Sequence, residues 1–376
     1  MTVLLWILGV LAVPLLAFGL WLAWVFVSTY VRETRGHREA AAEEAAAEIA
    51  AEGLAAAGFL PAEKLDTERG MPPRADEEAA LEAVRAGDWE VGARWLAAAG
   101  MEPEERFQRA SALAQLAAED DAWLKAWQSA RAGDADAALV EAQGLVRLAW
   151  RIRGAKRAQY TTREQFASFH AVLGRAQAAT HLAQRMADPR DGVPYVVEQA
   201  IALGLSYSHE RYETLWREIT ARCPRMTTAH FNAVQYWSKK WHGSHERAVA
   251  FARSTADGAR AGELLAHLPL VAWFEQVTHE DLDADEFFKR PEIVTAVDAA
   301  LADIGVAQAQ DPDSRALWWS RHIVTWVLYW QDRYPEALAQ FRAVDGWIGE
   351  MPWSYQADPV ETYTHMRGYC LARVED

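Results

Sequence analysis

Residues 134–150, with the sequence DADAALVEAQGLVRLAW, decide the fold class. Apolar side chains recur there at intervals of three and four residues, which places them on one face of a helix. They are Ala138, Leu139, Ala142, Leu145, Val146, Ala149 and Trp150. Asp134 precedes the pattern and can cap the helix N-terminus. The stretch is therefore predicted to be an amphipathic helix that buries one face against neighbouring helices.

The same helical period continues through most of the chain after Asp76, and its breaks fall at Gly, Asp and Pro. Residues 317–330, LWWSRHIVTWVLYW, are apolar on nearly all sides, which indicates a helix surrounded by others. No convincing strand pattern interrupts these segments. We therefore predict an all-α domain over residues 76–376.

Short turn sequences recur before the predicted helices. Gly87-Asp88-Trp89 and Gly133-Asp134 each lead to an alanine, and the tetrapeptide Ser-His-Glu-Arg occurs at 208–211 and again at 244–247, 36 residues later. This spacing is close to one helix–turn–helix repeat, and the turns resemble the start of the second helix in tetratricopeptide repeats. The W-x-x-L-G-x-x-Y consensus is absent. The predicted fold is therefore a degenerate α-helical hairpin array, a tetratricopeptide-like solenoid.

The first 31 residues carry no charged side chain, and residues 3–27 are dominated by large apolar types. These residues would form a helix of about 37 Å, long enough to cross a hydrocarbon core of about 30 Å. Arg32, Arg35 and Arg38 follow, and basic flanks tend to stay in the cytoplasm. We therefore predict a transmembrane anchor at 1–31 and a single-pass membrane protein whose C-terminal domain is cytoplasmic.

Residues 32–75 connect this anchor to the domain. Residues 39–58 contain 11 Ala and 5 Glu, which favours a solvated helical stalk. A disordered acidic tether is the alternative. Residues 59–75 contain Pro61, Gly70, Pro72 and Pro73 among charged side chains, which is typical of a linker.

The overall composition excludes several classes of function. A formal net charge of −15 disfavours nucleic-acid binding, because phosphate recognition needs clustered basic side chains. The two cysteines, Cys223 and Cys370, have no zinc or redox spacing. Phosphate-binding loops and catalytic motifs are also missing. We therefore expect no cofactor and no metal.

The most distinctive string is YWSKKWHGSHE at 236–246, followed by Phe251-Ala252-Arg253. It resembles the W-G-G-S-x-E…F-A-R signature of a bacterial domain family with helical, repeat-like architecture and no established activity. His242 departs from that signature, which has Gly at this position. The resemblance implies the fold and family membership, and it transfers no catalytic residue.

Two interpretations of this string stay open. As a turn, Trp241 would close one helix, Gly243 would adopt the left-handed cap conformation and Ser244 would cap the next helix. As a site, the string would bind a ligand. The candidate binding residues are then Trp237, Trp241, His242, Ser244, His245 and Glu246. Established metal-ligand spacings are absent, so no metal site is predicted.

One basic segment stands out in this acidic chain, because all charges between Glu141 and Glu164 are positive. Beneath a membrane, these side chains would face anionic headgroups, each contributing about 1 kcal/mol. A solvated face paired with acidic neighbours is the alternative. The predicted lipid-facing patch comprises Arg147, Arg151, Arg153, Lys156 and Arg157.

The expected function is that of a membrane-anchored helical-repeat adaptor that binds a protein or peptide on a concave, Trp-lined face. The alternative is an enzyme acting on a small molecule or glycan in a Trp/His-lined cavity, with His230, His242, His245 and Glu246 the first residues to substitute. A third interpretation is a structural cell-envelope or secretion component that self-associates through its anchor. The sequence does not identify the partner, the pathway or the oligomeric state.

Overall fold

The computed structural model describes residues 53–154 and 162–375. Over these residues the chain is helical and contains no strand; its β-type pairing is one isolated parallel bridge, between Asp66 and Trp347. The prediction of an all-α fold is therefore confirmed. The chain divides after Lys64, and the unit that begins at Leu65 contains everything described below.

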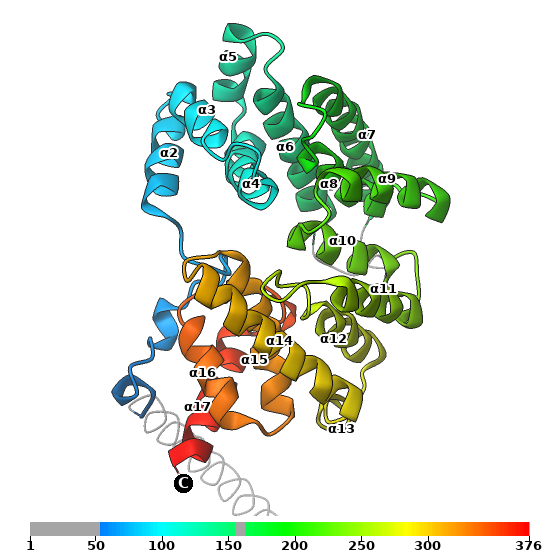
Figure 1. Cartoon of the computed structure of the whole chain (residues 1–376). Helices are drawn as coiled ribbons and strands as arrows, with labels where there is room; N and C mark the ends of the chain where they lie inside the picture. Colours follow the sequence, from blue (N-terminus) through cyan, green and yellow to red (C-terminus); the bar gives the residue numbers. More distant parts are fainter. Residues whose placement is uncertain (1–52, 155–161, 376) are drawn as a thin grey trace, which may run out of the picture. The chain divides into compact units, whose positions relative to one another are not determined.

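The first half of this unit is a succession of adjacent helices (Figure 1). In chain order these are α2 (Ala75–Arg85), α3 (Trp89–Ala97), α4 (Pro103–Glu119), α5 (Ala122–Ala130), α6 (Ala135–Arg153), α7 (Arg163–Met186), α8 (Val193–Gly204) and α9 (His209–Arg222). Helix α6 packs against both α4 and α7. It therefore lies at the centre of this half.

The second half continues the succession. Its elements are α10 (Thr227–Trp237), α11 (His245–Gly258), α12 (Leu268–Glu280), α13 (Ala284–Phe288), α14 (Pro291–Gln310), α15 (Ala316–Trp330), α16 (Tyr334–Ala343), the 3-10 turn η3 (Trp353–Tyr355) and α17 (Pro359–Glu375). Helix α15 contacts α12, α13, α14 and α16, and most of its length is buried. The prediction of a helix surrounded by others at 317–330 is confirmed.

Helix α6 forms as the sequence predicts. The Asp134 carboxylate accepts hydrogen bonds from the backbone N–H groups of Asp136 and Ala137, which satisfies two donors that the first turn leaves unpaired. Leu139, Ala142 and Ala149 on the predicted face are fully buried. Packing against α4 and α7 accounts for this burial.

The two Ser-His-Glu-Arg tetrapeptides occupy the same position in successive hairpins. Ser208 caps α9 and Ser244 caps α11, each helix having 14 residues. In both, the serine hydroxyl accepts from the backbone N–H of the arginine three residues later, at 3.3 and 3.2 Å. The repeated sequence therefore marks a repeated local structure.

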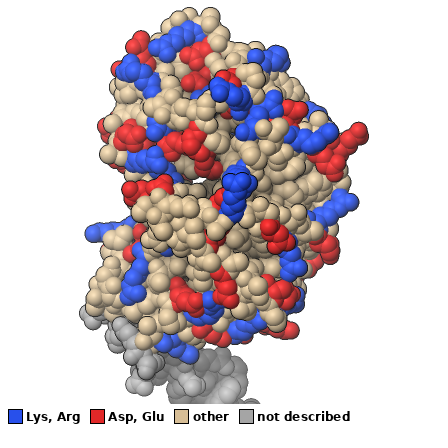
Figure 2. Space-filling model, in the orientation of Figure 1, with Lys and Arg blue, Asp and Glu red and all other residues tan. Residues whose placement is uncertain are grey.

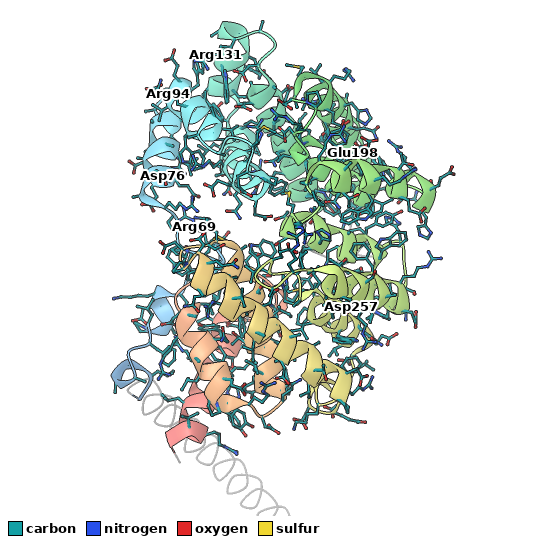
Figure 3. All side chains as sticks on the ribbon, in the orientation of Figure 1. Arg69, Asp76, Arg94, Arg131, Glu198 and Asp257 are labelled. Atoms are coloured by element: carbon teal, nitrogen blue, oxygen red, sulfur yellow. The ribbon has the colours of Figure 1, made fainter. Side chains whose placement is uncertain are left out.

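Residues 66–73 of the expected linker lie along the C-terminal helices. The Ile348 N–H donates to the Asp66 carbonyl, and the Gly349 N–H donates to the Arg69 carbonyl, both at 2.8 Å. A Cβ on Gly70 would lie 1.8 Å from Cγ of Glu350, so only glycine fits there without displacing that side chain. Figure 3 shows Arg69 at the C-terminal helices and Asp76 at the start of α2. This segment joins the first and last parts of the unit.

The predicted anchor at 3–27 and nearly all of the stalk fall outside the described residues. Across residues 53–154 and 162–375, no helix is both long and apolar enough to cross a membrane. The three longest helices in these ranges each carry charged side chains, such as Arg151 in α6, Arg175 in α7 and Asp298 in α14. This finding contradicts the expected localisation as a single-pass membrane protein.

Candidate functional site

The string at 236–246 forms a compact turn between α10 and α11. The backbone N–H groups of Trp241 and Gly243 both donate to the Ser238 carbonyl, at 3.1 and 3.2 Å. Ser244 caps α11 as predicted. The left-handed conformation predicted for Gly243 is wrong, because its φ is not positive. Glycine is needed there for a different reason: a Cβ would lie 1.8 Å from the Trp237 carbonyl oxygen.

The aromatic side chains of this turn pack against neighbouring helices. Trp237 lies edge-on to Tyr212, with 5.8 Å between ring centroids, and Trp241 lies edge-on to Trp150 at 5.5 Å. His242 places Nε2 3.0 Å from the Leu203 carbonyl oxygen. These contacts hold the turn against α6, α8 and α9.

The remaining binding candidates, His245 and Glu246, differ in burial. His245 is buried, with Nε2 3.3 Å from a Glu280 carboxylate oxygen, and burial lowers its pKa. Glu246 stays at the surface, where the Ser244 hydroxyl lowers its pKa. None of the six predicted binding residues lines the cavities described below.

His230, the further candidate of the enzymatic alternative, lies apart from this turn. Its Nδ1 is 2.9 Å from the Met226 carbonyl oxygen, and its ring packs edge-on against Trp216. Among the residues that the structure describes, no group of three or more His, Cys, Asp or Glu side chains could hold a metal ion. The structure therefore does not bring the candidate histidines together.

The described arginines of the predicted basic patch form hydrogen bonds and ring contacts with other residues of the chain. Arg147 donates to the Ser111 hydroxyl at 2.7 Å, and Arg151 donates to the Ala118 carbonyl. The guanidinium of Arg153 lies 5.5 Å from the Trp150 ring centroid and 5.4 Å from that of Trp241. Lys156 and Arg157 lie outside the described residues. The lipid-facing role of these side chains stays a prediction.

Three adjoining hollows lie inside the unit that begins at Leu65. The central cavity, about 810 Å³, is lined by Arg74 and by residues from four segments: 98–109, 222–227, 262–264 and 311–316. The inner pocket, about 280 Å³, shares Gln108 and Arg315 with it. The side cleft, about 740 Å³, shares Ala112, Gln115 and Arg147 with the inner pocket. Figure 2 shows a hollow bordered by side chains of both charges.

Charges along the central cavity are mostly paired. Glu105 accepts hydrogen bonds from both Arg74 and Arg109, each at 2.7 Å. Arg225 pairs with Glu263. These pairs hold the cavity wall in a defined shape and leave it nearly neutral. Such a wall suits a polar ligand without strong net charge.

Glu104 at the edge of this cavity caps a distant helix. Its carboxylate accepts hydrogen bonds from the backbone N–H and the hydroxyl of Thr228, in the first turn of α10. Met226, the N-cap residue, offers no side-chain acceptor, so Glu104 supplies the missing one. Burial raises the Glu104 pKa although these hydrogen bonds oppose the shift. The contact fixes α4 against α10.

The inner pocket holds a second desolvated carboxyl, that of Glu350. Burial raises its pKa to about 7, and the positive charge of Arg147 partly offsets the effect. Neither Glu104 nor Glu350 belongs to a sequence motif. The residues that each one meets in the folded protein, such as Thr228 for Glu104 and Arg147 for Glu350, lie far away in the sequence. Sequence reasoning missed both for this reason.

The tryptophans of the described residues occupy two kinds of place, the walls of these hollows and the helix-packing core. Trp319 lines the inner pocket and Trp150 lines the side cleft. Trp127 and Trp353 are instead fully buried core side chains. The abundance of tryptophan in this chain therefore serves helix packing as well as the cavity walls.

A comparison of the chain with protein-family models, curated proteins and solved structures finds no match. Membership of the family suggested by the string at 236–246 therefore stays a prediction.

Proposed function

We propose that this chain is a helical-repeat protein of the α-hairpin solenoid type that binds an extended peptide segment of a partner protein in its central cavity. The equivalent caps at Ser208 and Ser244, 36 residues apart, support the repeat assignment. Stacked hairpins produce concave faces that recognise other chains.

The central cavity carries the proposal. Its volume of about 810 Å³ is within the range of ligand sites, and its wall comes from several turns that are far apart in sequence. Paired charges such as Arg74 with Glu105 present both donors and acceptors. A peptide backbone offers the complementary groups at every residue.

Site-specific crosslinking of the full chain tests this function. A photoreactive amino acid is placed at Ala98, which is exposed and lines the cavity, or at the matched control Leu182, which is exposed on α7 and lines none of the hollows described above. We expect a defined segment of one partner to crosslink from position 98 and not from position 182. Equal labelling from both positions would contradict the proposal.

A synthetic peptide of the crosslinked segment then measures affinity. Ala98→Trp should weaken its binding at least about tenfold by narrowing the cavity, whereas Leu182→Trp should leave the affinity unchanged. Isothermal titration calorimetry of the full chain provides the measurement. A peptide that binds both variants equally well would place the partner on another surface.

A further inference from the structure

A further pocket, the aromatic pocket, lies among α9, α10 and α11. The ring of Trp216 is edge-on to that of His230, with 5.0 Å between centroids, and edge-on to that of Phe251 at 5.4 Å. All three side chains line the pocket, whose volume of about 460 Å³ is within the range of ligand sites. The turn before α10 and small side chains at the end of α11 complete its wall.

His230 presents an unused hydrogen-bond acceptor in this pocket. Its Nδ1 lies 2.9 Å from the Met226 carbonyl oxygen, which can only accept, so Nδ1 carries the proton. Burial lowers the pKa of the ring, so the other nitrogen, Nε2, is unprotonated at pH 7 and has a free lone pair.

This lone pair has no partner within the protein. The His230 side chain is only 6% exposed, yet no group among the described residues donates a hydrogen bond to Nε2. Polar atoms in such surroundings are normally hydrogen-bonded. Nε2 keeps some accessible surface, so a molecule in the pocket can reach it. The pocket therefore lacks one hydrogen-bond donor.

The charges along the aromatic pocket disfavour ionic ligands. Among the described residues that line it, Arg225 is the only charged side chain, and it pairs with Glu263. Aromatic faces attract cations, but a cation here would meet the guanidinium and no acidic group of the wall. An anion would meet the lone pair of His230. A neutral molecule with an N–H or O–H group complements the pocket better than either.

The orientation of the rings favours a flat ligand. The planes of Trp216 and His230 are 88° apart, whereas those of His230 and Phe251 are 32° apart. A bound ring can therefore lie parallel to one of them and edge-on to another. These are the two arrangements that aromatic pairs prefer.

We propose that the aromatic pocket binds a small neutral aromatic molecule that carries an N–H or O–H group, the class of indoles and phenols, with that group donating to Nε2 of His230. Trp216 and Phe251 contact the ligand ring. The pocket shares Pro224 and Arg225 with the central cavity but takes a different ligand, so this inference goes beyond the peptide-binding function.

Calorimetry of the full chain tests the ligand class. The probes are indole and 4-methylphenol, each compared with its methylated form, 1-methylindole or 4-methylanisole, which lacks the donor. Cyclohexanol keeps a donor without an aromatic ring. We expect indole or 4-methylphenol to bind, and its methylated form and cyclohexanol to bind at least about tenfold more weakly. Absence of binding by both probes at about 5 mM, or equal binding of a comparison compound, would overturn the proposal.

The variant His230→Asn tests the acceptor. Asparagine can still donate to the Met226 carbonyl but offers no acceptor at the position of Nε2. Indole should bind at least about tenfold more weakly, whereas the affinity for 1-methylindole should stay within about twofold, because that probe never formed the hydrogen bond. A general change of the pocket would affect both probes.

The matched control for this variant is His365→Asn, at an exposed position on α17. It should change neither affinity. Circular dichroism checks that both variants are folded. Unchanged indole affinity in folded His230→Asn protein, or the same loss for both probes, would overturn the assigned hydrogen bond.

A second variant tests the location without altering the histidine. Ser254 is exposed on α11 and lines the pocket, so Ser254→Trp should fill part of it and weaken indole binding at least about tenfold. Ser129→Trp, at an exposed position on α5 outside the pocket, should leave the affinity unchanged. Equal affinities of the two variants would overturn the location. Crosslinking from position 98 uses none of these side chains, so the peptide-binding proposal stands or fails separately.

Discussion

Two buried polar centres hold distant segments of this protein together, and they do so by different chemistry. In the first half, Arg106 on α4 lies between Asp136 of α6 and Asp191 before α8, at 2.5 and 2.8 Å. In the second half, the fully buried ring of His322 lies between Trp353 and Gly70. The first centre depends on full charges and the second on a neutral ring.

Hydrogen bonding explains why the second centre is neutral. The Trp353 indole N–H donates to Nδ1 of His322 at 3.0 Å, which requires a lone pair on that nitrogen. The proton is therefore on Nε2, which donates to the Gly70 carbonyl at 2.8 Å. A second proton would face the indole N–H, and burial also opposes the charge. The two centres should consequently respond differently to mutation and to pH.

The largest effect is expected from Arg106→Ala. Removing the guanidinium leaves two carboxylates without their cation, and the Asp191 side chain is almost completely buried. The free energy of unfolding should fall by about 3 to 5 kcal/mol, measured by urea denaturation. Arg94→Ala, which removes an exposed pair with Glu90, should cost no more than about 1 kcal/mol. Similar losses for both variants would show that the charged centre does not stabilise the fold.

The second prediction concerns pH, because protonation of His322 should destabilise the neutral centre. Burial lowers the pKa of His322 to about 4, whereas an unfolded histidine titrates near 6.5. The unfolded chain therefore binds the extra proton first, so stability is retained above about pH 6.5 and is lost as the pH falls toward 4. The loss from this residue should be about 3 kcal/mol.

The contribution of His322 is measured by comparing the unfolding free energies of the wild-type protein and the His322→Gln variant. The difference in unfolding free energy between wild type and variant should shrink by about that amount from pH 7 to pH 4. His267 is equally buried, its pKa is also lowered to about 4, and it remains in both proteins, so its contribution cancels. A difference that is constant with pH would show that His322 is not held neutral.

The smallest loss of stability is expected when the hydrogen-bond donor of the neutral centre is removed. Trp353→Phe removes the donor to His322 Nδ1 but keeps an aromatic ring in the core. The loss should be about 1 to 3 kcal/mol, because one buried acceptor is left unsatisfied. Thermal and urea unfolding at pH 7 measure it. A loss as large as that of Arg106→Ala would contradict the view that neutral partners are easier to remove than charged ones.

Local patterns account for much of what could be predicted. The three-and-four spacing around Leu139 depends on helix geometry alone, and Asp134 and Ser244 cap helices within three residues of themselves. Gly243 shows where such reasoning stops. Its turn was predicted, but its need for glycine arises from a carbonyl six residues earlier that only the folded turn brings close.

The candidate site was less accessible to sequence reasoning. The string at 236–246 attracted attention because it is rich in Trp and His, yet its side chains pack into neighbouring hairpins. Glu350 and Arg147 are ordinary charged residues 203 positions apart in the sequence. They share a pocket only because residues 66–73 and α6 approach the turn after α16.

The sequence by itself determined that the described residues after Asp76 are mainly helical and that the chain carries a formal net charge of −15. These properties follow from residue spacing, capping and charge, which act over a few residues or over the whole composition. Tertiary structure alone decided which charges are paired, which carboxyls lose water and which turns surround a cavity. Those outcomes depend on contacts between segments far apart in the chain, whose approach is set by the packing of all the helices together.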